Sequence, residues 1–236
     1  MTLLAVERLS TGYRGTPVIR QVSLELAAGE VVALIGPNGH GKTTLLRALS
    51  GLLPITGGRV LLEGRALNGL KPHRITAAGI SHVPQGDRLF QQMTVMENLQ
   101  VAGDAIADRA RYRERLERVF ALFPKLKERR DQIASSLSGG ERRMVGIGRG
   151  LMLGGRILVL DEPSLGLAPI VVDQIYEALS ALRAARTSIL LVEENPERAA
   201  ALADRIYMIH NGRLVWSGDS AAALANPELV KVYLGG

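Results

Sequence analysis

Short runs of apolar residues, separated by glycine-rich and polar turns, recur along the chain and predict many strands. Residues 30–35, 157–160 and 188–192 are almost entirely apolar, which is typical of strands buried on both faces of a parallel sheet. In residues 18–26 apolar and polar positions alternate, which indicates a strand with one buried face. Further strands are expected at residues 3–9, 59–63, 80–84, 205–209 and 213–216, the last two joined across Asn211-Gly212.

Helices are predicted where apolar residues recur every three or four positions behind a capping residue. Thr94 with Glu97, and Ser138 with Glu141, have the capping-box pattern. The order of the elements predicts an α/β core, with about residues 88–150 inserted as a helical segment. The expected helices are residues 44–50, one opening at 94, an arginine-rich one ending before Pro124, 138 to about 153, 170–183, one opened by Asn195, and a short closing one opened at Asn226.

Composition agrees with a globular protein of one large domain or two packed lobes. The chain has 236 residues, 47% of them hydrophobic, and none of its apolar runs approaches the ~20 residues of a membrane span. It contains no cysteine, which excludes disulfides and thiolate metal sites, and its first residues lack a signal-peptide pattern.

The net charge of +6 is concentrated in one region. Residues 109–130 carry nine Arg or Lys against three Glu. Such an excess can bind anionic lipid or nucleic acid. We favour the simpler interpretation, a solvated helix face, because Tyr112, Leu116, Val119 and Phe123 recur at helical spacing on the other face.

The clearest chemical signal is a phosphate-binding loop between the strand at 30–35 and the following helix. Its pattern is glycine, four residues, glycine, lysine and threonine. Its glycines let backbone N–H groups surround an anion, Lys42 reaches the β- and γ-phosphates, and the Thr43 hydroxyl is placed for Mg²⁺. The strand–loop–helix context argues against an ordinary glycine-rich turn. The loop consists of Gly36, Pro37, Asn38, Gly39, His40, Gly41, Lys42, Thr43 and Thr44.

Polar residues at the ends of other predicted strands belong to the same hypothesis. Asp161 and Glu162 follow a buried strand, where α/β proteins bind ligands. Asp161 suits the Mg²⁺ shell and Glu162 suits polarisation of an attacking water, although two adjacent acids can also merely cap a loop. Gln85 and Glu194 likewise follow strands.

Two further features have an open interpretation from the residues alone. Ser138-Gly139-Gly140 opens a helix, where it either binds phosphate or forms an ordinary cap. Tyr13 lies in a glycine-rich turn, where its ring either stacks on adenine or has no role.

The order of these motifs closely resembles the nucleotide-binding subunit of ABC transporters, and the resemblance covers essentially the whole chain. Leu-Ser-Gly-Gly before Asp-Glu is its most specific element. The resemblance implies a P-loop NTPase core with a mostly parallel sheet, an antiparallel β subdomain and a helical insertion. It implies a single ABC ATPase domain over 1–236, in which 1–87 and 151–236 form the nucleotide-binding core and 88–150 the helical subdomain with the signature motif. Three segments look more narrowly like branched-chain amino-acid importers: Val-Pro-Gln-Gly-Asp-Arg-Leu-Phe, Met-Thr-Val-Met-Glu-Asn-Leu and Glu-Pro-Ser-Leu-Gly-Leu-Ala-Pro.

The family mechanism implies ATP and Mg²⁺ bound between two cassettes. Lys42, Thr43, Gln85, Asp161 and Glu162 would act on one nucleotide, with Gln85 sensing the γ-phosphate and Mg²⁺. Ser138, Gly139 and Gly140 would contact the partner's nucleotide, and Tyr13 would stack on adenine. The implied partners are a second ABC ATPase subunit, integral membrane permease subunits and, indirectly, a solute-binding protein, with no nucleic acid expected. The implied location is peripheral, on the cytoplasmic face of the inner membrane.

Some positions depart from the wider family pattern. His40 occupies a usually small position, Ala168 replaces a common Asp, Glu141 replaces a common Gln, and Glu194 stands where most cassettes have a histidine that contacts the γ-phosphate. Beside a triphosphate, Glu194 is expected either to be protonated and donate a hydrogen bond, or to turn away. The alternative function is therefore a degenerate cassette that binds ATP but hydrolyses it poorly and depends on a partner.

Overall fold

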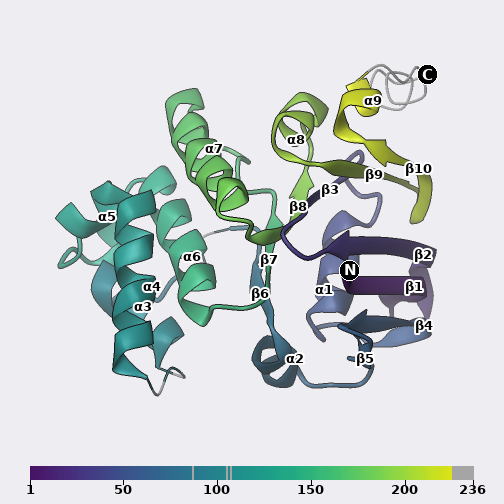
Figure 1. Ribbon diagram of the computed structural model, residues 1–236, viewed down its shortest axis with the longest axis horizontal. Coiled ribbons are helices and arrows are strands. Elements are labelled where there is room, and N and C mark those ends of the chain that lie inside the picture. The colour runs from purple at the N-terminus through teal and green to yellow at the C-terminus, as the bar shows by residue number, and fades with distance from the viewer. Residues whose placement is uncertain (87, 105, 107, 225–236) are drawn as a thin grey trace.

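Two β-sheets form the framework of the computed structural model, which describes residues 1–86, 88–104, 106 and 108–224 (Figure 1). The four-stranded sheet has the order β2-β1-β4-β5 and is antiparallel throughout. The six-stranded sheet has the order β10-β9-β3-β8-β7-β6, and within it only the pair β9 and β10 is antiparallel. The strands are β1 Thr2–Tyr13, β2 Thr16–Ala27, β3 Val31–Ile35, β4 Ile55–Leu62, β5 Arg65–Ala66, β6 Ile80–Val83, β7 Ile157–Asp161, β8 Ser188–Glu193, β9 Arg205–His210 and β10 Arg213–Asp219.

Alternate residues of the central strands enter two separate cores, which explains why those strands are apolar throughout. In β3, Val32 and Leu34 face a core that also contains the buried side of α1 (Lys42–Leu49) and residues of the antiparallel sheet. Val31, Ala33 and Ile35 face the other core, which contains α6 and α7. Burial on both faces fixes the strand register, because a one-residue slip would exchange the two sets.

Most remaining helices pack beyond the second face of the six-stranded sheet, as Figure 1 shows. The helix α6 begins at the N-cap Ser138, whose capping box with Glu141 is formed as expected, and the capping box of Thr94 and Glu97 opens α3. The helices are α2 Pro72–Ala78, α3 Val95–Gly103, α4 Arg109–Leu122, α5 Pro124–Glu128, the 3-10 turn Ala134–Ser136, α6 Gly139–Leu153, α7 Pro169–Ala184, α8 Pro196–Leu202 and α9 Ser220–Leu224.

The α/β architecture predicted from the sequence is confirmed, with differences at element ends. β1 and β2 are longer than expected, and β4 begins at Ile55 because pairing with β1 continues through a bulge at Gly57-Gly58, where Gly58 has a φ angle of 76°. The short elements β5, α2 and α5 carry too few residues to show a period, and the sequence did not reveal them. The closing helix expected at Asn226 lies outside the described residues.

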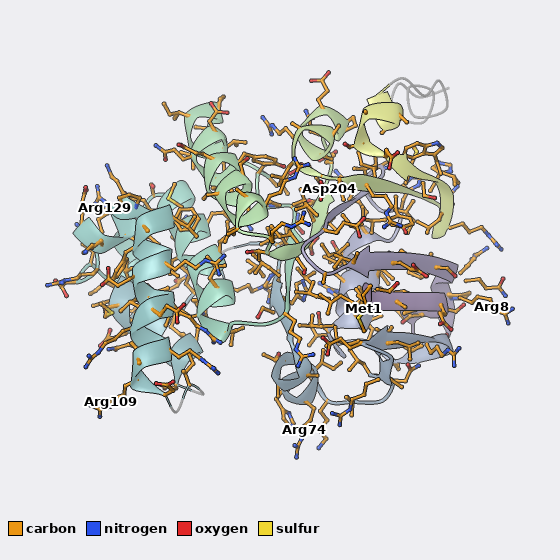
Figure 2. All side chains as sticks on the ribbon, in the orientation of Figure 1. Met1, Arg8, Arg74, Arg109, Arg129 and Asp204 are labelled. Atoms are coloured by element: carbon orange, nitrogen blue, oxygen red, sulfur yellow. The ribbon has the colours of Figure 1, made fainter. Side chains whose placement is uncertain are left out.

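The basic segment forms an exposed face. Arg109, Arg111 and Arg113 of α4 are exposed, whereas Val119 and Phe120 are buried. Figure 2 shows Arg109 and Arg129 at the outer edge of the helical group. This arrangement agrees with the solvated-face interpretation. None of the helices in the described part of the chain has the length and apolar character needed to cross a membrane.

His82 on β6 is a partly buried titratable group next to α1. The Ser50 hydroxyl donates to the carbonyl of Leu46, so its oxygen is left to accept from Nδ1 of His82 at 2.8 Å, while Nε2 has no partner among the residues that the structure describes. Burial, followed by the positive charge of Arg47, lowers the pKa of His82 from 6.5 to about 4. The unfolded chain therefore binds a proton more tightly than the folded chain between these two pH values, and stability falls as the pH drops through this window.

We expect the titration of His82 to lower the free energy of unfolding by up to about 3 kcal/mol between pH 7 and pH 4, at ~1.4 kcal/mol per pKa unit. Urea unfolding at several pH values, with His82→Gln and the exposed-site control His73→Gln, measures this. The His82 variant should lose less stability on acidification than the wild type and the control. Equal losses in all three would show that His82 is not the titrating group.

Candidate nucleotide-binding and hydrolysis site

The loop between β3 and α1 is pressed against neighbouring strands at its two ends. At Gly36 the φ angle is 154°, and a Cβ there would lie 2.2 Å from the carbonyl oxygen of Ile209. At Gly41, where φ is 106°, a Cβ would lie 2.6 Å from Cδ1 of Ile19. Only glycine fits these two positions, so the backbone is free to curve around an anion at the start of α1.

Lys42 lies inside this curve with its side chain buried. Its Nζ donates to the carbonyl oxygens of Gly36 at 2.7 Å and Pro37 at 3.3 Å, and it lies 3.4 Å from Oε1 of Glu162. The ammonium group therefore already occupies the centre of the loop. Thr44, behind it in the first turn of α1, is buried.

His40 points outward, toward the turn between β9 and β10. Its ring stacks on that of His210, with centroids 4.6 Å apart, and its Nδ1 accepts from the N–H of Asn211 at 3.0 Å. Burial first, then the nearby His210 and Lys42, lower its pKa. A large residue is tolerated here because its side chain leaves the inside of the loop, and as a neutral ring it adds no charge beside Lys42.

Asp161 and Thr43 form an oxygen-rich pair at the end of β7. The Thr43 hydroxyl donates to Oδ1 of Asp161 at 3.2 Å, and Asp161 is 2% exposed. Burial is the main cause that raises the pKa of Asp161; the hydrogen bond from Thr43 opposes this and the charge of Glu162 adds to it. A buried carboxylate next to a hydroxyl is a suitable pair of ligands for a hard divalent cation such as Mg²⁺, whose positive charge would stabilise the ionised form that burial disfavours.

Glu162 is held between two other residues of the site. Its Oε1 faces Lys42, and its Oε2 accepts from Nε2 of Gln85 at 2.9 Å. Its backbone has a φ angle of 49°, the left-handed region that non-glycine residues adopt only when their surroundings hold them there. This orientation directs the carboxylate toward the phosphate-binding loop.

Glu194 also contacts the phosphate-binding loop. Its Oε1 accepts from Nδ2 of Asn38 at 2.9 Å. Glu194 is thus an acceptor at the loop in this arrangement. The two alternatives derived from the sequence, a protonated donor or a side chain turned away, concern Glu194 beside a triphosphate and stay predictions. Glu194 occupies the loop rim next to Lys42, which lies 3.4 Å from Oδ1 of the same Asn38.

The structure thus brings seven of the predicted residues into one continuous cluster of contacts: Asn38, Lys42, Thr43, Gln85, Asp161, Glu162 and Glu194.

In the described part of the chain, no hydrogen bond or ion pair joins Tyr13 or Ser138 to this cluster. The hydroxyl of Tyr13 accepts from Arg47 of α1 at 3.0 Å, and the residue is 39% exposed. Gly139 and Gly140 open α6, and a Cβ on Gly140 would lie 2.4 Å from Val171 of α7.

The sequence analysis missed the residue just before Glu194. Glu193 is 2% exposed and accepts hydrogen bonds from Ser164 and Tyr176. The available signal was a charged residue that ends an otherwise apolar strand, at the strand end that faces the site.

Comparison with known proteins places this site in a family. The model of the ABC transporter family matches residues 19–165. The chain is 44% identical to the high-affinity branched-chain amino acid transport ATP-binding protein BraG of Pseudomonas aeruginosa, over 99% of this chain and 100% of that protein. It is 34% identical to the lipopolysaccharide export system ATP-binding protein LptB of Acidithiobacillus ferridurans, over 99% of this chain and 97% of that protein.

Among solved structures, the ADP conformation of MJ1267, an ATP-binding cassette of an ABC transporter, aligns over the whole of both chains with a TM-score of 0.86 at 28% identity. The chain therefore belongs to the ABC transporter family, and it is a nucleotide-binding ATPase of that family.

The contact between Glu194 and Asn38 generates a prediction about charge. Glu194→Gln keeps an oxygen that accepts from Asn38 and removes a negative charge next to the position of a triphosphate. We expect the ATPase rate of the assembled complex to be unchanged or higher, at an unchanged ATP affinity. Steady-state phosphate release and ATP titration measure both quantities.

The matched control is Glu197→Gln, which removes one charge from the first turn of α8 outside the cluster. A tenfold fall in turnover for Glu194→Gln alone, at unchanged ATP affinity, would mean that the carboxylate takes part in the chemistry.

Proposed function

We propose that this chain is the ATP-hydrolysing subunit of an importer for branched-chain amino acids or related small polar solutes. The observation that carries the catalytic part is the buried contact of Lys42 with Glu162, and of Glu162 with Gln85, beside the phosphate-binding loop. The 44% identity to BraG over the full length supports the solute class.

In the proposed reaction, the backbone N–H groups of residues 36–41 and the ammonium of Lys42 hold the phosphates of ATP. Thr43, Gln85 and Asp161 would hold Mg²⁺, which supplies positive charge to the leaving diphosphate and the γ-phosphate. Glu162 orients a water and accepts its proton as the oxygen attacks the γ-phosphorus, and the bond to the β-phosphate oxygen breaks to leave ADP. Lys42 must exchange its contact with Glu162 for the phosphates, which frees this carboxylate.

The proposal requires a second cassette. Among the described residues, Ser138, Gly139 and Gly140 form no hydrogen bond or ion pair with this chain's own cluster, and they present a helix start with a polar cap. They would complete the ATP site of the partner cassette, whether a second copy or a different subunit, and Tyr13 would stack on the adenine. ATP binding would favour the closed pair and hydrolysis the open pair, which shifts the membrane subunits between two states.

A groove beside Gln85 would receive the permease subunit. It encloses about 280 Å³ between the end of β6, α3 and α6, and its lining includes Val83, Arg88, Val101 and Leu153. The exposed side chain of Phe90, which packs under the guanidinium of Arg149 with 4.8 Å to its centroid, extends the apolar rim. A peripheral location at the cytoplasmic face of the inner membrane follows from this proposal.

Export, the opposite direction of transport, also has specific support. The similarity to LptB extends over nearly the whole chain, and an export system is therefore the second candidate. The degenerate-cassette alternative rests on Glu194 in place of histidine.

The direct test uses the complex captured from its native cells through a tagged chain, reconstituted in vesicles with its solute-binding protein. We expect ATP-dependent uptake of leucine, isoleucine or valine, or of another small solute that raises the melting temperature of that binding protein. Lys42→Ala should abolish uptake, whereas Lys71→Ala on the exposed loop before α2 should not. If the tagged chain instead captures a lipid exporter, without a solute-binding protein, the proposed import function is contradicted.

A further inference from the structure

Glu193 is the last residue of β8 and is buried at 2% exposure, although the four residues before it, 189–192, are apolar and fully buried. It pairs in register with Ile35, the residue just before the phosphate-binding loop. Burial of a carboxylate costs folding free energy unless several hydrogen-bond donors satisfy it. The donors around Glu193 therefore indicate its role.

The donors to Glu193 come from three separate segments. Its Oε2 accepts from the hydroxyl of Tyr176 on α7 at 2.6 Å, and the Ser164 hydroxyl lies 2.9 and 3.1 Å from its two oxygens. Its Oε1 accepts from the backbone N–H of Glu194 at 2.9 Å and of Asn195 at 3.3 Å. Burial, followed by the charge of Glu193, raises the pKa of Tyr176 far above its usual value, so the phenol remains a donor.

Two of these segments carry residues of the contact cluster at the phosphate-binding loop. Ser164 stands two positions after Glu162, whose backbone has the left-handed φ of 49°, and Glu194 contacts the phosphate-binding loop through Asn38. Between the two segments lies a cavity of about 440 Å³, lined by Glu162, Ser164, Glu193, Glu194 and Arg198 among others. The backbone N–H of Glu162 donates to the carbonyl of Val192 at 3.0 Å, which joins the two segments at the strand ends. Beyond that point the cavity separates their side chains, and the hydrogen bonds of Glu193 connect Ser164 to the segment of Glu194.

We propose that Glu193 is a positioning residue for ATP hydrolysis: with Ser164 and Tyr176 it holds the segment of Glu162 and the segment of Glu194 in one arrangement. It does not itself touch the nucleotide. The inference rests on the proposed role of Glu162 as the group that activates water. Loss of the network should leave ATP binding intact and lower turnover, because the carboxylate of Glu162 then samples unproductive orientations.

The first test is Tyr176→Phe in the assembled complex, with ATP turnover and melting temperature measured together. Removing one hydrogen bond to a charged group should lower kcat about tenfold and leave KM for ATP within about twofold. The matched control is Tyr207→Phe, which deletes a phenol that is 7% exposed and bonded to the backbone N–H of Glu25 between the two sheets. The control should lower the melting temperature with little change in kcat.

A second pair of variants separates hydrogen bonding from mere loss of structure. In Glu193→Gln the amide oxygen still accepts from the two backbone N–H groups, and the hydroxyls of Ser164 and Tyr176 rotate to accept from the amide NH₂. We expect Glu193→Gln to retain most of the kcat that Glu193→Ala loses. Ser164→Ala gives an independent measurement if Glu193→Ala does not fold.

The decisive comparison places Tyr176→Phe in a Glu162→Gln background and follows radiolabelled ATP. If the network acts through Glu162, the second change lowers the residual turnover by less than about twofold. An equal tenfold loss in both backgrounds, or an unchanged kcat for Tyr176→Phe alone, overturns the positioning role. Near-normal turnover of Glu162→Gln itself would instead contradict the proposed function.

Discussion

The parallel register of β3, β6, β7 and β8 is the constraint on which the site depends. These strands are buried on both faces, so each can occupy only one register without moving its side chains into the wrong core. Because they run in the same direction, the loops that follow them emerge at one edge of the sheet. Ile35 therefore lies beside Glu193, and Asp161 beside Val192, which brings segments more than 100 residues apart to one phosphate-binding loop.

The acidic side chains gathered at this edge of the sheet need partners that stabilise their negative charge. Each carboxylate has a different kind of partner. Lys42 and Gln85 stabilise Glu162, while backbone N–H groups and hydroxyls stabilise Glu193. Asp161 has mainly Thr43, and burial raises its pKa, so a divalent cation beside it would stabilise the ionised carboxylate. The cluster therefore keeps more negative than positive charge before a nucleotide arrives, and ATP entering the loop must compete with Glu162 for Lys42.

The sequence predicted the architecture and the members of the cluster because both depend on local signals. Apolar runs located the core strands, and glycine spacing located the phosphate-binding loop. Side-chain directions set by tertiary packing were not predictable. The sequence offered no reason for a large residue such as His40 in the phosphate-binding loop. In the structure its ring stacks on that of His210, which lies 170 positions further along the chain. The contact of Glu194 with Asn38 and the bond from Tyr176 to Glu193 depend likewise on how α7 and α8 pack on the sheet.

The measurement that tests the central claim most directly is the turnover of the assembled complex with Glu162→Gln. The substitution keeps the shape of the side chain and its bond with Gln85, but it removes the group that accepts the proton of water. The account predicts that ATP still binds while turnover falls by at least ~100-fold, the range of a positioned general base. Near-normal turnover with unchanged ATP affinity would contradict it.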